Sequence, residues 1–132
     1  MIRKKKMPKI LIVDDEPGMR ILLEQTLEGF EDKGVVLLTA DNGKKAIECI
    51  KTEKPELVFL DVMMPEINGF EICNTVKNEY GMNDVYIVML TAKGQETDKQ
   101  KGKDVGVDIY MTKPFDLDEI VKKAVEILGI KP

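Results

Sequence analysis

Residues 9–17 read KILIVDDEP, and this stretch decides the fold. The aliphatic run at residues 10–13 predicts a strand that other elements cover on both faces. The run ends abruptly in Asp14 and Asp15, and Pro17 then occupies a position where proline is favoured as the first residue of a helix. The stretch therefore predicts a buried strand, an acidic loop and a helix, in that order.

The same order of strand and helix repeats four more times along the chain. Strand-sized apolar runs occupy residues 35–40, 57–60, 85–90 and 109–111, and each is followed by a segment that we interpret as a helix. Right-handed crossovers return the chain to start each strand alongside an earlier one, so this order predicts an α/β protein with a parallel sheet and helices on both faces. The carboxyl ends of the strands then share one edge, where ligands of such sheets bind.

Composition limits the classes of function. A chain of 132 residues with 43% hydrophobic content fits one compact domain with one sizeable core. The net charge is −4, and the lysines are scattered among acids, so we expect no direct contact with nucleic acid. No apolar run approaches the roughly 20 residues that span a bilayer, and no secretory segment is present, so we expect a cytoplasmic protein without membrane contact.

The chain contains no histidine, which excludes serine-histidine and cysteine-histidine catalysis and imidazole-based zinc sites. Cys49 and Cys73 lie far apart among apolar residues, without a CxxC pair, and are predicted to be reduced core thiols. Carboxylates must therefore carry any chemistry.

The predicted domain spans residues 8–129. Residues 1–7 form a basic arm that we expect to be solvated, and residues 130–132 form a short tail.

Five polar side chains follow the predicted strands at their carboxyl ends: Asp14, Asp15, Asp61, Thr91 and Lys113. Each of them alone is more often a turn or surface residue. Together they place three carboxylates at one edge, where each pair about 4 Å apart would repel by roughly 4 kcal/mol at an effective dielectric of 20. A bound divalent cation removes that cost, and an all-oxygen pocket suits Mg²⁺, with Mn²⁺ as a substitute. The Asp61 carboxylate could then attack phosphorus and form an acyl phosphate.

Four sequence blocks in this order resemble the receiver domain of two-component response regulators, over nearly the whole chain from Pro8 to about Leu128. The blocks are ILIVDDEP at 10–17, LDVMMP at 60–65 with NGF at 68–70, LTA at 90–92 and YMTKPF at 110–115. The resemblance implies a flavodoxin-like (βα)5 doubly wound parallel sheet, with strand order 2-1-3-4-5 and three α/β/α layers. The chain resembles a stand-alone receiver of the chemotaxis-regulator type.

By this resemblance Asp61 is the phosphoacceptor. Asp14 and Asp15 would organise the metal, and Asp15, Asp61 and the backbone carbonyl of Met63 would be its direct protein ligands. Such a protein is not an enzyme in the usual sense, because it catalyses only its own Mg²⁺-dependent phosphorylation and dephosphorylation.

The resemblance also implies a switch beside the phosphoacceptor. Thr91, Ala92 and Lys113 would bind the phosphoryl oxygens, and Tyr110 would move between outward and inward rotamers as Thr91 moves, which is a shift of population. The peptide bond between Lys113 and Pro114 is expected to be cis.

The implied partners are proteins. Because the chain has no histidine, its phosphoryl donor would be a sensor histidine kinase or a phosphotransfer protein, and an unidentified protein would read the phosphorylated state. We expect a monomer or a weak dimer. The fourth helix, between Gln95 and Val105, lacks apolar residues from Glu96 to Asp104, so we expect it to be short or mobile until phosphorylation or binding orders it.

Three other functions remain open at this level. A catalytic phosphatase would need a general acid near Asp61, but Met63 occupies the position two residues later. A receiver-fold binding module that is not phosphorylated would share the fold, although the intact acidic residues argue against it. The N-terminal receiver of a longer DNA-binding regulator would have the same sequence features as a stand-alone receiver.

Overall fold

The computed structural model describes residues 7–92 and 99–132, so the arm predicted at residues 1–7 lies almost wholly outside the described residues. One parallel sheet contains all five predicted strands, in the order β2-β1-β3-β4-β5. The strands are β1 (Lys9–Val13), β2 (Val36–Ala40), β3 (Leu57–Asp61), β4 (Tyr86–Ala92) and β5 (Ile109–Lys113). The predicted strand order 2-1-3-4-5 is confirmed, and each strand lies within two residues of its predicted bounds at either end.

Helices follow the strands, and side chains cap the N-termini of α2, α3 and α5. The helical segments are α1 (Pro17–Leu27), the 3₁₀ turn η1 (Glu28–Lys33), α2 (Gly43–Glu53), α3 (Gly69–Asn74), the π turn η2 (Thr75–Glu79), α4 (Lys99–Val105) and α5 (Leu117–Leu128). Asn42, Asn68 and Asp116 each accept a hydrogen bond from a backbone N–H in the first turn of α2, α3 and α5. In α5, the Asp116 carboxylate accepts from the N–H of Asp118 (2.9 Å).

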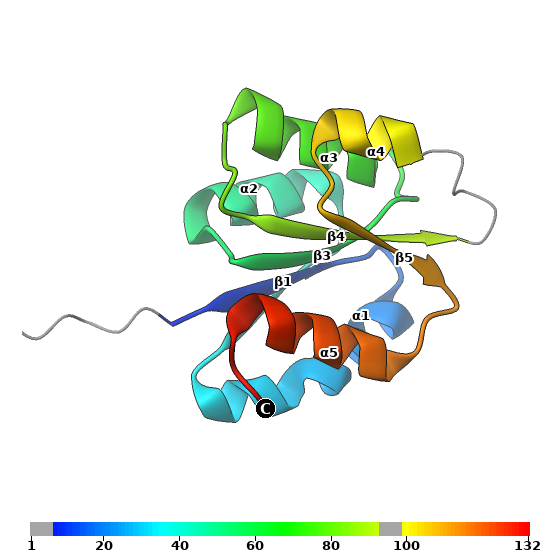
Figure 1. Cartoon of the computed structure of the whole chain (residues 1–132). Coiled ribbons are helices and arrows are strands. Elements are labelled where there is room, and N and C mark those ends of the chain that lie inside the picture. Colours follow the sequence, from blue (N-terminus) through cyan, green and yellow to red (C-terminus); the bar gives the residue numbers. More distant parts are fainter. Residues whose placement is uncertain (1–6, 93–98) are drawn as a thin grey trace, which may run out of the picture.

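Three layers result, as predicted. Helices α1 and α5 cover one face of the sheet, and α2, α3 and α4 cover the other (Figure 1). Alternate residues of the central strand β1 enter opposite cores: Leu11 and Val13 pack toward α2 and α3, whereas Ile10 and Ile12 pack toward α1 and α5. Every residue of β3 is buried. The two central strands are therefore fixed from both sides, and the ends of these strands carry the predicted acids.

A short turn continues the chain beyond α1. Helix α1 ends at Leu27, and the chain then runs through η1 and closes at Gly34, whose φ of 86° is left-handed. The buried ring of Phe30 holds this turn against the core, which is a tertiary contact that helical spacing does not reveal.

The fourth helix is described only from Lys99 onward, and residues 95–98 of the prediction lie outside the described residues. The Lys101 ammonium lies 5.0 Å from the centre of the Phe70 ring on α3, and Val105 at the end of α4 packs against the core.

The two thiols are free, but only Cys73 is fully buried; Cys49 is half-buried on α2. Across the described residues, no helix is both long enough and apolar enough to span a bilayer.

Candidate metal centre

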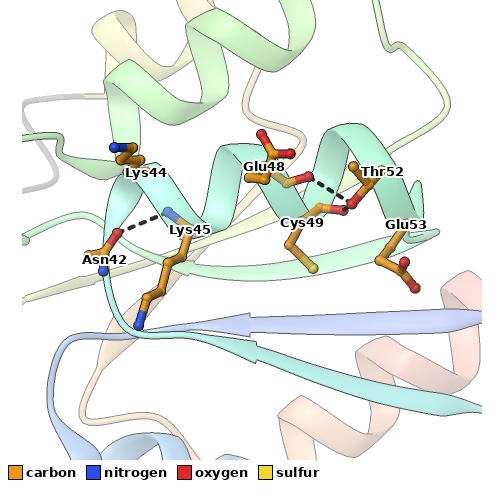
Figure 2. Close-up of a pocket in the computed structure, with 7 residues that line it drawn as sticks. All are labelled: Asn42, Lys44, Lys45, Glu48, Cys49, Thr52 and Glu53. Atoms are coloured by element: carbon orange, nitrogen blue, oxygen red, sulfur yellow. Dashed lines mark hydrogen bonds between the residues drawn. The ribbon is translucent and has the colours of Figure 1, made fainter.

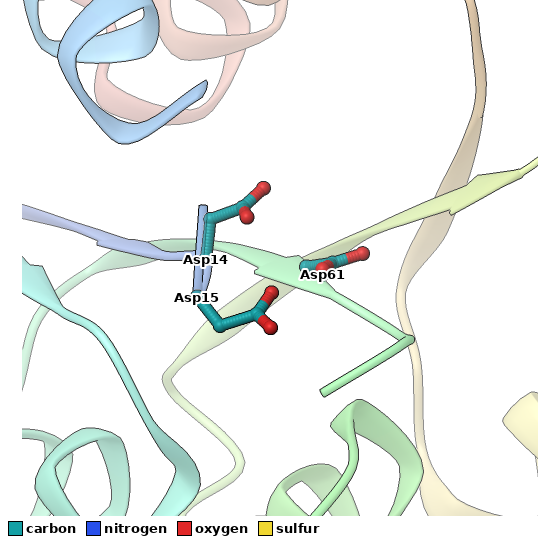
Figure 3. Close-up of side chains that lie close together, drawn as sticks. All are labelled: Asp14, Asp15 and Asp61. Atoms are coloured by element: carbon teal, nitrogen blue, oxygen red, sulfur yellow. The ribbon is translucent and has the colours of Figure 1, made fainter. Parts of the chain in front are cut away.

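Three carboxylates meet where the central strands end. Asp14 directly follows β1 and Asp61 ends β3, and the pairing of Val13 with Leu60 sets these strand ends side by side. Asp14, Asp15 and Asp61 each contribute a carboxylate oxygen, and these oxygens all lie within 4.8 Å of one another (Figure 3). The strand order reverses here, because β1 pairs with β2 on one side and with β3 on the other. The cluster thus lies at the topological switch point of the sheet, which is where ligands bind in open α/β folds.

Asp14 is completely buried, and two hydrogen bonds with neighbouring backbone groups fix its position. Its N–H donates to Ala40 O (3.2 Å), and its Oδ1 accepts from the N–H of Glu16 (2.9 Å). Its other carboxylate oxygen, Oδ2, is buried and has no hydrogen-bond partner among the described residues, with only the Lys113 ammonium at 3.7 Å. A buried carboxylate oxygen is costly to leave unpaired, so this atom is one that a bound cation would satisfy.

Lys113, the last residue of β5, directs its ammonium toward the carboxylates of Asp14 and Asp61. Its Nζ lies 3.4 Å from Asp61 Oδ1 and 3.7 Å from Asp14 Oδ2. The Lys113–Pro114 peptide bond is cis. One ammonium faces three carboxylates, so the site keeps an excess of negative charge that matches a divalent ion.

Burial dominates the proton affinities at this site. It raises the pKa of Asp61 to about 6, because the desolvation effect exceeds the opposing attraction of Lys113, and the neighbouring Asp14 adds to the rise. Burial also raises the pKa of Asp14, against the N–H of Glu16 and the charge of Lys113. These shifts show that the carboxylates are held in an environment that disfavours their charge.

The donor set fits a hard divalent cation. The three side chains offer only carboxylate oxygens, which Mg²⁺ and Mn²⁺ prefer, whereas a structural zinc site would use sulfur or nitrogen. Positive charge in the pocket would give Asp14 Oδ2 a close partner and would favour the ionised form of Asp61, whose pKa burial raises. The residues present therefore fit the predicted metal.

The other predicted site residues lie around this cluster. Thr91 is buried one residue beyond Leu90, which pairs with Asp61, and its hydroxyl donates to Ala92 O (3.3 Å). The Met63 side chain is exposed, and the Met63 N–H donates to Asp61 Oδ1 (3.4 Å). Tyr110 is half-buried and packs against the core on the α2 and α3 side. Lys113 Nζ and the Met63 N–H both reach the Asp61 carboxylate, whereas the Thr91 hydroxyl is directed to Ala92 O.

One residue at the site was missed by sequence reasoning. The Arg20 Nη1 group donates to the backbone carbonyl of Asp14 (2.8 Å) from the first turn of α1. The sequence did offer a signal for this contact, because Arg20 lies one turn into the helix that follows the acidic loop. This contact fixes the carbonyl of Asp14 and keeps the acidic loop against the start of α1.

A second hollow lies on the outer face of α2 (Figure 2) and includes none of the predicted site residues. Its lining alternates lysines and glutamates with shorter side chains: Asn42, Lys44, Lys45, Glu48, Cys49, Thr52 and Glu53. Such a mixed row along one helix is typical of a solvated face. Among the described residues, the acidic cluster thus lies at the carboxyl edge of the sheet and not in this hollow.

The family model described as the response regulator receiver domain matches residues 10–125. The chain belongs to this family. The receiver resembles the alkaline phosphatase synthesis transcriptional regulatory protein PhoP of Bacillus subtilis (strain 168), with 42% identity over 91% of this chain and 48% of the relative. It also resembles the DNA-binding dual master transcriptional regulator RpaA of Synechocystis, with 37% identity over 92% of this chain and 49% of the relative. This receiver thus spans about half the length of these curated relatives.

Solved structures give the same family and the same fold. A putative response regulator from Chloroflexus aurantiacus matches with a TM-score of 0.81 and 32% identity, over 95% of this chain and 100% of that chain. The chemotaxis protein CheY4 of Vibrio cholerae matches with a TM-score of 0.80 and 30% identity, over 92% of this chain and 99% of that chain. The predicted resemblance to receivers and the flavodoxin-like fold are both confirmed.

Proposed function

We propose that this receiver accepts a phosphoryl group on Asp61 from a phosphohistidine of a sensor kinase or phosphotransfer protein, with Mg²⁺ bound by Asp14, Asp15, Asp61 and the Met63 carbonyl. One observation carries the proposal: Asp61 is a buried carboxylate that lies within 4.8 Å of two others and 3.4 Å from Lys113 Nζ. Phosphorylation of an aspartate requires a carboxylate nucleophile, a nearby cation and further carboxylates that can bind a metal ion. Asp61, Lys113 and the pair Asp14 and Asp15 supply these groups at the carboxyl edge of the sheet.

The chemistry is a direct displacement at phosphorus. A carboxylate oxygen of Asp61 attacks the phosphorus, a P–O bond forms while the P–N bond to the donor imidazole breaks, and the imidazole nitrogen keeps the electron pair. Lys113 already contacts Asp61 Oδ1, so its ammonium can follow the charge onto the new phosphoryl oxygens. Bound Mg²⁺ supplies the remaining neutralisation of the carboxylates and of the transferring oxygens.

The phosphoryl group would act on the rest of the domain through Thr91. Its buried hydroxyl bonds only to Ala92 O among the described partners, and rotation would let this hydroxyl donate to a phosphoryl oxygen. Tyr110 pairs in register with Met89, two residues before Thr91, so a shift of β4 changes the space around its ring. Phosphorylation therefore favours one of two pre-existing arrangements of a surface that another protein reads.

Acetyl phosphate provides the direct test. Wild-type protein incubated with acetyl phosphate and Mg²⁺ is expected to gain the mass of one phosphoryl group by intact mass spectrometry, and EDTA is expected to prevent the gain. Failure to gain mass with Mg²⁺ present would instead favour a receiver-fold binding module that is not phosphorylated. Multiple turnover on a generic phosphate ester would indicate a catalytic phosphatase.

An apolar hollow beside the site supports a protein donor. It lies between α1 and the segment that follows β5, and it is lined by Met19, Leu22, Ala92, Lys113, Pro114, Phe115 and Leu117. Because Lys113 belongs to both the hollow and the acidic cluster, a partner seated there reaches Asp61 directly.

Leu22→Lys is expected to slow phosphorylation by a protein donor but not phosphorylation by acetyl phosphate. Leu22 is 39% exposed in this hollow, and a buried lysine there would oppose docking, so transfer from a kinase or phosphotransfer protein that phosphorylates the wild type should slow about ten-fold or more. The rate with acetyl phosphate should stay within about two-fold, because the small donor needs no docking surface. Thr52→Lys adds the same charge to the exposed face of α2 and is the matched control. Equal slowing with both donors would contradict the docking role.

The names of the curated relatives point to the type of output. Both are transcriptional regulators, and the receiver matches about half of each. With a net charge of −4, the receiver itself has no basic surface bias toward DNA. We therefore propose that its phosphorylated surface acts on a protein domain or protein partner rather than on DNA directly.

A further inference from the structure

Gly43 begins α2 and fits against another loop with no room for a side chain. The Asn42 side chain caps this helix by accepting from the N–H of Lys45 (2.9 Å; Figure 2), and Gly43 behind it is buried. A Cβ at Gly43 would lie 2.5 Å from Ile67 Cβ and 2.9 Å from the Ile67 backbone oxygen. Real Cβ contacts essentially never come closer than 3.0 Å, so any side chain here must displace Ile67.

Ile67 belongs to the loop 62–68, which starts directly after Asp61 and contains Met63. The loop is closed at its base by the bond from Gly69 N–H to Val62 O (3.0 Å) and tightened by the bond from Ile67 N–H to Pro65 O (2.8 Å). It also contains Glu66 in the left-handed region, with φ of 66°. Because these hydrogen bonds tie the loop to itself, we expect a displacement of Ile67 to shift the backbone of the whole loop, including Met63.

We propose that Gly43 is a positioning residue for the metal site: its missing side chain lets the start of α2 hold the loop 62–68 in the place that metal binding requires. The inference rests on the proposed function, in which Asp61 and the Met63 carbonyl bind Mg²⁺. Gly43 would touch neither the metal nor the phosphoryl group. It acts through Ile67.

The accuracy with which Mg²⁺ ligands must be placed sets the expected loss of Mg²⁺ affinity. Restoring an ordinary contact of at least 3.4 Å from 2.5 Å moves Ile67 or α2 by roughly 1 Å. Mg²⁺ needs near-octahedral ligands at about 2.0–2.1 Å, and ligand positions must hold to about 0.2 Å. A loop displaced by several times that tolerance should bind Mg²⁺ at least ten-fold more weakly, even while the fold persists.

Gly43→Ala tests the inference in the full chain. Mg²⁺ binding is measured by isothermal titration calorimetry on EDTA-stripped, dialysed protein, with the fold of each variant checked by circular dichroism without metal. We expect Gly43→Ala to weaken Mg²⁺ binding ten-fold or more. Gly18→Ala is the matched control, because a Cβ at Gly18 meets nothing within 4 Å, and it should leave the affinity within two-fold.

A second variant separates positioning from a general loss of stability. Ile67→Gly in the Gly43→Ala background removes the two side-chain atoms that the new Cβ would strike, Ile67 Cβ and Cγ2, and leaves the backbone oxygen at 2.9 Å, just inside the 3.0 Å limit, so that only a small shift remains. We expect this double variant to regain most of the Mg²⁺ affinity relative to Gly43→Ala, although its melting temperature should stay below that of the wild type. A merely structural role predicts the opposite, with affinity and melting temperature falling further together.

The outcomes distinguish the inference from the proposed function. If the wild type itself shows no saturable Mg²⁺ binding, the metal site fails and the inference fails with it. If the wild type binds and Gly43→Ala binds equally well, only the positioning role of Gly43 is overturned. If Gly43→Ala does not fold, the double variant decides alone: a folded protein that binds Mg²⁺ within a few-fold of the wild type supports the inference, and any other result overturns it.

Discussion

Asp61→Asn is expected to abolish phosphoryl uptake from acetyl phosphate and, in the absence of metal, to increase the free energy of unfolding at pH 8. The loss of uptake follows from removal of the nucleophile. The gain in stability follows from burial: the Asp61 side chain is 8% exposed, and its pKa is raised from 3.8 to about 6. An ionised Asp61 is therefore less favourable in the folded protein than in the unfolded chain, and the neutral amide of similar shape removes that cost.

The sign and the pH window follow from proton linkage. Between pH 3.8 and about 6 the folded wild type binds more protons at Asp61 than the unfolded chain does, so its stability falls as pH rises through this window. The stabilising contribution is fully present below pH 3.8 and is lost above about pH 6. The shift corresponds to on the order of 3 kcal/mol at pH 8, which is the upper limit of the gain expected for the variant.

Urea unfolding in EDTA measures this difference. Asp61→Asn should exceed the wild type at pH 8, and the difference should disappear near pH 4. Added Mg²⁺ should stabilise the wild type more than the variant, because the ion replaces the missing positive charge. Glu126→Gln, in an exposed pair with Lys123, is the control and should change little at either pH. A variant that is less stable than the wild type at pH 8 would contradict the electrostatic account.

Asp108→Ala is expected to lower the free energy of unfolding by about 3 kcal/mol or more. Asp108 Oδ2 accepts from Lys77 Nζ (3.0 Å) and from the N–H of Ile87 (2.8 Å), and the Lys77 side chain is only 8% exposed. The substitution leaves a buried ammonium and a buried strand N–H without this carboxylate. The pair also ties the π turn η2 to β4 and to the entry of β5, so its loss loosens elements on one side of the sheet.

Urea unfolding compares this variant with two others. Asp108→Asn keeps an oxygen for Ile87 N–H but loses the charge, so it should fall between Asp108→Ala and the wild type. Lys123→Ala removes an exposed pair with Glu126 and should stay within about 0.5 kcal/mol of the wild type. A loss below about 1 kcal/mol for Asp108→Ala would show that water replaces the carboxylate at Lys77.

Local patterns were sufficient for the architecture and for the acids. The continuous aliphatic run before Asp14 could fit only a strand covered on both faces, and the structure buries residues 10–13 completely. An acid at the end of each central strand must lie at the shared carboxyl edge, because parallel strands point the same way. Asp14, Asp15 and Asp61 are therefore brought together by topology alone.

Contacts between segments distant in sequence decided the rest. The close contact of Gly43 with Ile67 and the burial of Lys77 beside Asp108 each join residues that no periodicity relates. Periodicity reports which face of an element is apolar, whereas these contacts depend on distances of a few tenths of an ångström between elements. The sequence by itself determined the sheet and the acidic edge; only the tertiary structure decided how closely the surrounding loops hold that edge, because close packing is a property of elements already assembled.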